Sequence, residues 1–240
     1  MFPLAGSIAF PRKRLMSLQT VSLASLQQQI DAVSRPGQPV RLLAVSKLQP
    51  AAAIAALAAQ GQRAFGENYV QEAAAKIQEL AALALEWHLI GHLQSNKAEV
   101  AARSFHWVQT VDRPKLVEAL ARHRPPALPP LNVLIQVNID DEDSKHGCQP
   151  AQVPALAEAI AAHARLRLRG LMAIPAPFPE HDRRQAAFTR MRGLFDALAA
   201  RHAHVDTLSM GMSSDFAEAI AAGSTMVRVG TALFGQRPTP

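Results

Sequence analysis

Short apolar runs alternate along the chain with longer stretches whose apolar positions repeat every three or four residues. The short runs predict strands over residues 40–46, 63–65, 87–90, 106–111, 132–139, 166–174, 207–210 and 226–229. The longer stretches predict helices over residues 15–33, 51–60, 70–85, 96–103, 114–123, 151–164, 183–202 and 214–222. Strands and helices therefore alternate from residue 40 onward.

This alternation is typical of a parallel sheet with helices packed outside it. Eight repeats within 240 residues predict an α/β fold with one closed (β/α)8 barrel, the TIM barrel, rather than an open sheet. We expect residues 16–240 to form this barrel domain and residues 1–15 to be a disordered extension, with Met16 as an alternative start of translation. Residues that follow the strands of such a barrel meet at one face, where active sites lie.

The composition of the chain limits its expected cellular location and its expected partners. The formal net charge is +6, but basic residues are scattered apart from the cluster Arg12-Lys13-Arg14, so we expect no nucleic-acid partner. Binding of nucleic acid through that cluster is kept as an alternative. The single cysteine, Cys148, cannot form an internal disulfide, and no apolar run is long enough to span a bilayer. We therefore expect a cytoplasmic monomer that does not bind membranes.

Polar residues at the strand ends supply the candidate chemistry. Lys47 directly follows the first strand, and a partly desolvated amine there could condense with an aldehyde, although a surface lysine at a strand end is an equal alternative. Ser213 lies between a strand and a helix, where it could hold an anion or cap the helix together with Ser214. Gly230 and Thr231 follow the last strand. Barrels often bind phosphate in the loops after strands seven and eight, so the two loops together favour a phosphate site.

Other polar and sulfur-containing residues fit structural roles. His88 and His92 could suggest a metal, but no Asp, Glu or Cys stands at ligand spacing, so hydrogen-bonded structural histidines and no metal are predicted. Met172, Met210 and Met212 are expected to fill the core. Glycine motifs for dinucleotides or nucleoside triphosphates are absent from the sequence.

Five segments in order resemble the pyridoxal phosphate homeostasis proteins. They are residues 44–47 (AVSK), 65–72 (FGENYVQE), 87–97 (WHLIGHLQSNK), 210–215 (MGMSSD) and 225–235 (TMVRVGTALFG). The similarity runs from about Ser17 to the C-terminus. The sequence departs from the family at Leu48 and Gln49, where a short polar pair is common.

This resemblance implies a barrel similar to the N-terminal domain of bacterial alanine racemase, with pyridoxal 5'-phosphate joined to Lys47. It also implies that the protein binds and supplies the cofactor in vitamin B6 and amino-acid homeostasis, with apo pyridoxal-dependent enzymes as partners. The other cofactor-binding residues that it implies are Asn68 near the ring, Arg228 at the pyridine nitrogen, Ser213, Gly230 and Thr231 at the phosphate, and His88 and Met210 in the same pocket.

A carrier is preferred to an enzyme, so no catalytic residue is predicted. Arg228 can only donate hydrogen bonds, which favours an unprotonated ring nitrogen and a weaker electron sink. Racemases share this feature, but racemisation needs a second base, which alanine racemase takes from an added domain, and Tyr69 is the only tyrosine. An amino-acid racemase or lyase, and a phosphate-sugar aldolase that uses Lys47 without a cofactor, stay open as alternatives.

Overall fold

The computed structural model describes residues 21–140, 146–176 and 178–235, and they form a closed barrel of parallel strands. The strands follow one another around the ring in chain order, and β1 pairs with β8 so that Leu43 lies opposite Arg228. They are β1 (Arg41–Val45), β2 (Ala64–Glu67), β3 (Glu86–Leu89), β4 (Trp107–Val111), β5 (Leu131–Gln136), β6 (Leu166–Met172), β7 (Thr207–Met212) and β8 (Met226–Val229). The predicted (β/α)8 barrel is confirmed.

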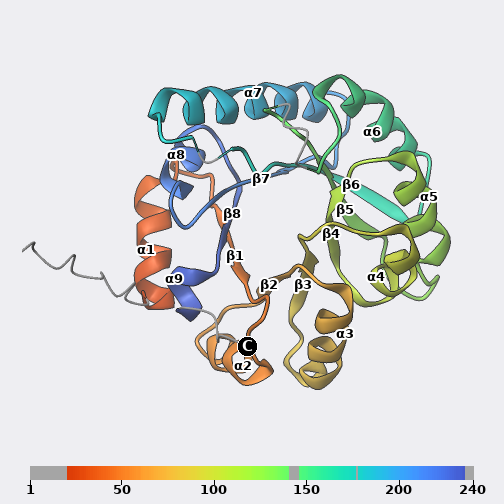
Figure 1. The fold of residues 1–240 in the computed structure, drawn as a ribbon, viewed down its shortest axis with the longest axis horizontal. Coiled ribbons are helices and arrows are strands. Elements are labelled where there is room, and N and C mark those ends of the chain that lie inside the picture. The colour runs from red at the N-terminus through yellow and green to blue at the C-terminus, as the bar shows by residue number, and fades with distance from the viewer. Residues whose placement is uncertain (1–20, 141–145, 177, 236–240) are drawn as a thin grey trace, which may run out of the picture.

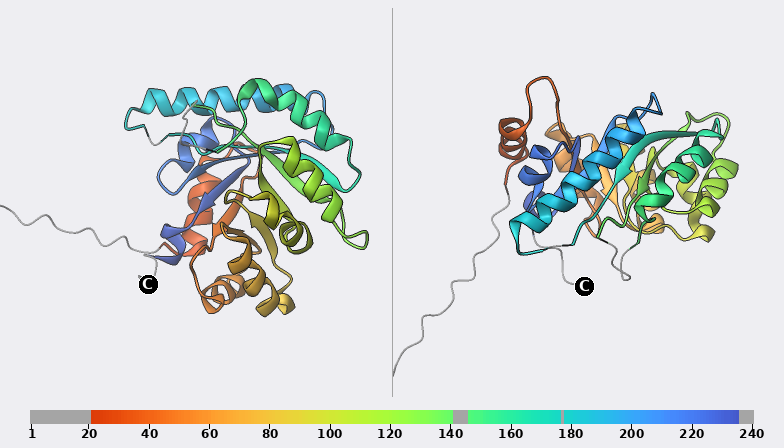
Figure 2. Two further views of the ribbon diagram at one scale, coloured as in Figure 1. Left: turned by 45° about the vertical axis from the view of Figure 1, so that its right-hand side comes forward. Right: turned by 90° about the horizontal axis from the view of Figure 1, so that it is seen from above.

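Helices surround the ring of strands (Figure 1), and Figure 2 shows this arrangement from two further sides. They are α1 (Leu23–Val33), α2 (Ala51–Ala59), α3 (Val70–Glu79), α4 (Ala98–Ser104), α5 (Pro114–His123), α6 (Val153–Ala161), α7 (His181–Ala199), α8 (Phe216–Ala221) and α9 (Thr231–Phe234). The part of the chain that the structure describes also contains the short 3₁₀ helices η1 (Ala81–Leu83), η2 (Ser95–Lys97) and η3 (Pro150–Gln152).

Element ends differ from the prediction where local capping or a turn intervenes. The helix predicted from residue 15 begins at Leu23, because the Ser22 side chain accepts the N–H of Ser25 and caps it. The helix predicted over 70–85 ends at Glu79, and η1 then leads into Ala84, which has a left-handed backbone. Helix α9 was not predicted, since four residues are too few to show a periodicity.

The domain boundary predicted between residues 15 and 16, and the cluster Arg12-Lys13-Arg14, lie outside the described residues. Within the described residues, no helix is both long enough and apolar enough to cross a membrane.

Most of the apolar core lies between the strands and the surrounding helices. The barrel interior holds two small apolar clusters, one of Leu43, Ala64, Ile90 and Met226 and one of Trp107, Leu134 and Met172. Between these groups the interior is polar, since His88, Gln109 and Ser209 are fully buried there. Branched apolar residues usually fill such an interior, so a buried polar layer is a departure that requires hydrogen-bond partners.

His88 illustrates how this polar layer is satisfied. Its Nε2 lies 2.6 Å from Glu86 Oε1, its Nδ1 lies 2.9 Å from Gln109 Nε2, and its ring stacks on Trp107. Burial lowers the pKa of His88 to about 4, so the imidazole is neutral at neutral pH. The hydrogen-bonded structural histidine predicted from the sequence is thus found at this position.

The free energy of unfolding should fall as the pH drops from 6.5 towards 4, because His88 then binds a proton in the unfolded chain but not in the folded protein. One pKa unit corresponds to about 1.4 kcal/mol, so the shift to about 4 is worth about 3 kcal/mol. Urea unfolding at several pH values should show a flatter slope for His88→Gln. The exposed histidine variant His204→Gln is the control, and equal slopes for His88→Gln and wild type would contradict the buried neutral imidazole.

Gly170 and Gly193 should respond oppositely to alanine. Gly170 has φ 143°, and a Cβ there would lie 1.9 Å from the carbonyl oxygen of Thr207. Gly193 lies in α7 with nothing within 4 Å of a built Cβ. Denaturant unfolding should show Gly170→Ala destabilised by about 2–4 kcal/mol and Gly193→Ala stabilised by about 0.5–1 kcal/mol. A tolerated Gly170→Ala would mean that β6 and β7 can separate.

Candidate functional site

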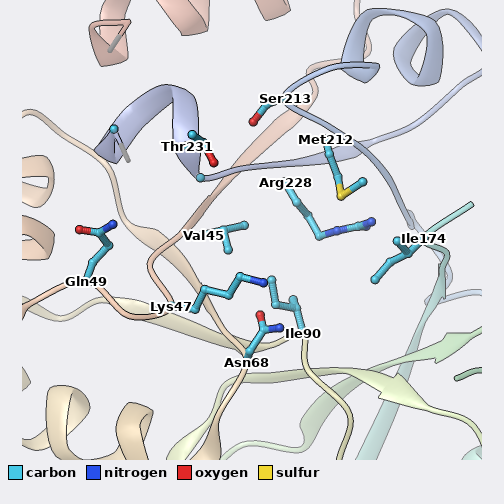
Figure 3. A pocket seen from close by; sticks show the side chains of 12 residues that line it. Val45, Lys47, Gln49, Asn68, Ile90, Ile174, Met212, Ser213, Arg228 and Thr231 are labelled. Carbon is cyan, nitrogen blue, oxygen red and sulfur yellow. The ribbon is translucent and has the colours of Figure 1, made fainter. Parts of the chain in front are cut away.

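A cavity opens where β1, β2, β7 and β8 end (Figure 3). The space between its lining residues is about 750 Å³ when the open mouth is included. Its lining residues are Val45, Lys47, Gln49, Asn68, Ile90, Ile174, Met212, Ser213, Arg228, Gly230, Thr231 and Gly235. Residues from both ends of the sequence therefore meet at the face of the barrel where the strands end.

The cavity brings together six of the eight residues predicted to bind a ligand. These are Lys47, Asn68, Ser213, Arg228, Gly230 and Thr231. His88 and Met210 are fully buried and are not among the lining residues. His88 points into the barrel two residues before Ile90, and Met210 packs in the large core on the side of the helices. A cofactor contact for these two stays a prediction, and the cavity geometry does not favour it.

Met212 takes the place in the cavity that was predicted for Met210. The pairing of β7 with β8 shifts between Ser209 and Met212, and Gly211 has φ 92°. This irregularity turns Met212 toward the cavity, so of the three methionines expected in the core only Met172 and Met210 are fully buried.

The alternative role of Ser213 and Ser214 as helix caps is wrong. Helix α8 begins after Asp215, and no side chain caps it. Instead, Asp215 Oδ1 accepts the N–H of Met212 at 2.6 Å, which holds the loop in a tight turn. The Ser213 hydroxyl faces the cavity near Thr231, so both can reach the same ligand group (Figure 3).

Arg228 is the most buried charged group of the cavity, with 4% of its surface exposed. Its Nη1 donates to the carbonyl oxygen and the Oγ of Ser209, and its Nη2 donates to the carbonyl oxygen of Ala173, each at 2.8 Å. Burial lowers the pKa of Arg228 to about 10, so it stays charged at neutral pH. These bonds use three of its five N–H donors, which leaves two for a ligand.

The turn that carries Lys47 is held by hydrogen bonds on both sides. Leu48 adopts a left-handed backbone, φ 61°, which is unfavourable for a branched side chain. Its N–H donates to Glu72 Oε1 at 2.7 Å, and the carbonyl of Ser46 accepts from Lys76 Nζ at 2.9 Å. Helix α3 thus fixes the residues before and after Lys47, and the strained turn directs Lys47 into the cavity.

The anchor of this turn is a buried ionic cluster that the sequence analysis missed. Lys76 Nζ lies 2.9 Å from Glu67 Oε1 and 2.6 Å from Glu72 Oε1. Burial raises the pKa of Glu67, while hydrogen bonds from Ser46 and Lys76 oppose that rise. A signal was present, because Lys76 follows Ala73 on the buried face of α3 and stands four residues after Glu72.

Two other chemistries find no support near the cavity. Residues 21–140, 146–176 and 178–235 contain no group of three or more His, Cys, Asp or Glu side chains placed to hold a metal. Cys148 is buried, and burial raises the pKa of its thiol to about 11, so a thiolate nucleophile is not formed at neutral pH.

Comparisons with known proteins agree with this geometry. Residues 21–238 match the family model described as alanine racemase, N-terminal domain. The pyridoxal phosphate homeostasis protein of Escherichia coli is 53% identical over 223 residues, 90% of this chain and 95% of that protein. The protein of the same name from Pseudomonas aeruginosa is 52% identical over 214 residues, 89% of this chain and 92% of that protein.

Solved structures give the same picture. The structure of PipY from Synechococcus elongatus without PLP is 41% identical to this chain, with a TM-score of 0.81. The match covers 89% of this chain and 98% of PipY. A second structure of PipY contains bound PLP. Alanine racemase of Corynebacterium glutamicum shares the fold at 22% identity and a TM-score of 0.64, covering 92% of this chain and 63% of that one. The chain therefore belongs to the family of the pyridoxal phosphate homeostasis proteins, as its sequence motifs predicted.

Proposed function

We propose that this protein binds pyridoxal 5'-phosphate in the cavity as a Schiff base with Lys47 and acts as a reversible carrier or buffer of the cofactor in vitamin B6 and amino-acid homeostasis. The observation that carries the proposal is the meeting of Lys47, Arg228, Ser213 and Thr231 in one cavity. Its relatives are named for pyridoxal phosphate homeostasis, and PipY binds PLP.

The amine of Lys47 suits the covalent step. Its half-buried side chain extends along the cavity beside Ile90 and Asn68 (Figure 3). The Lys47 amine would form a C–N bond with the aldehyde of the cofactor, and the carbonyl oxygen would leave as water together with the two protons that the nitrogen gives up. Hydrolysis reverses each step without breaking a C–H bond, so attachment can be undone when the cofactor is released.

The remaining lining groups fit the other parts of the cofactor. The hydroxyls of Ser213 and Thr231 can donate to a phosphate, and Gly230 keeps the backbone open there, since a Cβ would lie 3.1 Å from the carbonyl oxygen of Val45. The two remaining N–H donors of Arg228 suit a ring nitrogen that accepts. A guanidinium cannot accept a hydrogen bond from a protonated ring nitrogen, so it favours the unprotonated ring. An unprotonated ring is a weak electron sink.

The lining also supports a carrier over a racemase. Of the described residues that line the cavity, Lys47 alone, apart from Arg228, carries a group that titrates in water. Racemisation needs a second base on the opposite face of the substrate, and Tyr69 is 54% exposed and does not line this cavity. A racemase-like enzyme stays the second candidate, because the alanine racemase fold is shared.

We further propose apo pyridoxal-dependent enzymes as acceptors of the cofactor. The expected cytoplasmic location, the monomeric state and the lack of a nucleic-acid partner stay predictions from the sequence.

Replacing Lys47 with alanine should abolish covalent attachment while leaving the fold intact, because a half-exposed side chain contributes little packing. The wild-type protein mixed with pyridoxal phosphate should develop a visible absorption band, and borohydride should fix the adduct on Lys47. Lys97→Ala, at the end of η2, is the matched control and should behave as wild type.

Peptide mapping of the reduced adduct decides the site. An adduct on a lysine other than Lys47 in the wild-type protein would overturn the assignment. Absence of a band with pyridoxal phosphate, with a Lys47 adduct formed by a sugar phosphate instead, would favour the aldolase alternative.

Amino acids in heavy water should gain no deuterium at Cα, because Arg228 favours an unprotonated ring nitrogen and therefore a weak electron sink for the carbanion that exchange requires. Mass spectrometry across a panel of amino acids, with the loaded protein at catalytic concentration, measures this directly. The same loaded protein should restore activity to an apo pyridoxal enzyme. Deuterium uptake by the wild-type protein that disappears in Lys47→Ala would overturn the carrier function and favour the racemase-like enzyme.

A further inference from the structure

A continuous chain of hydrogen bonds leads from Arg228 through the barrel interior, away from the cavity. Arg228 Nη1 donates to Ser209 Oγ, and Ser209 Oγ donates to Gln109 Oε1, both at 2.8 Å. Gln109 Nε2 lies 2.9 Å from His88 Nδ1, and His88 Nε2 lies 2.6 Å from Glu86 Oε1. Four of the five residues have at most 4% of their surface exposed, and only Glu86 reaches solvent.

The direction of this chain is fixed by a sulfur atom. Gln109 Nε2 also lies 3.2 Å from the Sδ of Met226, and a thioether can only accept a hydrogen bond. The amide nitrogen, not the oxygen, must therefore face both Met226 and His88. His88 Nδ1 then accepts, so its proton resides on Nε2 and is donated to Glu86. Every donor in the chain points away from Arg228.

The direction of these hydrogen bonds offsets part of the free-energy cost of burying the charge of Arg228. The described residues give its guanidinium three hydrogen bonds, and all of their acceptors are neutral. Burying a cation without a hydrogen-bonded carboxylate is costly, and the Asp215 carboxylate acts on Arg228 through space without an ion-pair contact among the described residues. A chain of aligned dipoles that ends on the Glu86 carboxylate stabilises the positive charge from a distance, while leaving the ligand side of Arg228 open.

Neighbouring aromatic and charged groups hold the far end of the chain. The His88 ring stacks on Trp107, with centroids 5.1 Å apart and planes inclined by 10°. The guanidinium of Arg41 forms an ion pair with Glu86, and burial of Glu86 is outweighed by His88 and Arg41, which lower its pKa to about 2. Glu86 is therefore ionised at neutral pH and can act as the remote counter-charge.

We propose that Ser209, Gln109 and His88 are positioning residues that fix the orientation and charge of Arg228 toward the ring nitrogen of the bound cofactor, with Glu86 as the remote counter-charge. This inference rests on the proposed function, since it assumes that Arg228 faces the ligand. A chain that served only to fill the barrel could be replaced by apolar residues of equal size without changing how the ligand is held.

The test uses the full-length loaded protein and the variants Ser209→Ala, Gln109→Met and their double variant. Each single change should weaken pyridoxal phosphate binding about tenfold, as expected for the loss of a hydrogen bond to a charged group. The double variant should be no weaker than the more affected single variant, because both changes break the same chain. The visible absorption maximum of the bound cofactor should shift in all three.

Gln62→Met is the matched control. Gln62 is also a buried glutamine, and it donates to the carbonyl oxygens of Leu42 and Ala64 outside this chain. It should lower the thermal midpoint but leave the affinity and the absorption maximum unchanged. If Gln109→Met does not fold, Ser209→Ala compared with wild type and Gln62→Met decides the question alone.

The outcomes separate this inference from the proposed function. A wild-type protein without a visible adduct would reject the proposed function itself. A wild-type adduct with unchanged affinity and absorption maximum in Ser209→Ala would reject the positioning chain and leave the function standing. Equal shifts in Gln62→Met, or additive losses in the double variant, would show general loosening of the barrel and would also overturn the inference.

Discussion

A positive charge buried inside a closed barrel constrains the whole arrangement of the site. Arg228 is almost fully removed from water, so the barrel itself must supply its hydrogen-bond partners. Those partners are Ser209 within β7 and the carbonyl of Ala173 directly after β6. The last strands must therefore keep their register, and the irregular pairing of β7 with β8 turns Met212 into the cavity beside the same guanidinium.

The neighbouring wall of the cavity, at the end of β1, is also held in place by polar groups. The turn that carries Lys47 includes a left-handed residue, and the ion cluster on α3 offsets that strain through hydrogen bonds to the flanking backbone. On both walls, a charged side chain that faces the cavity, Lys47 or Arg228, is held in place by hydrogen bonds from the elements behind it. Such support fixes the cavity before a ligand arrives, which reduces the ordering cost of binding.

This construction is consistent with a carrier. In the proposed function, Lys47 forms and releases a covalent bond, whereas the described lining offers no further group to move a proton at carbon. Arg228 contributes charge and direction, but it exchanges no proton at neutral pH. The barrel is the fold that this chain shares with alanine racemase. The fold alone does not supply the second base that racemisation requires.

The alternation of strands and helices by itself determined the barrel, and the rule that strand ends meet at one face was sufficient to bring Lys47, Ser213 and Thr231 together. Only the tertiary structure decided that Met212 rather than Met210 lines the cavity, because an irregular pairing between neighbouring strands changes which face a side chain takes. It also decided the partners of Lys76 and His88. Periodicity reports which side of an element is buried, whereas a buried polar group is stabilised by atoms from distant segments that meet only when the barrel closes.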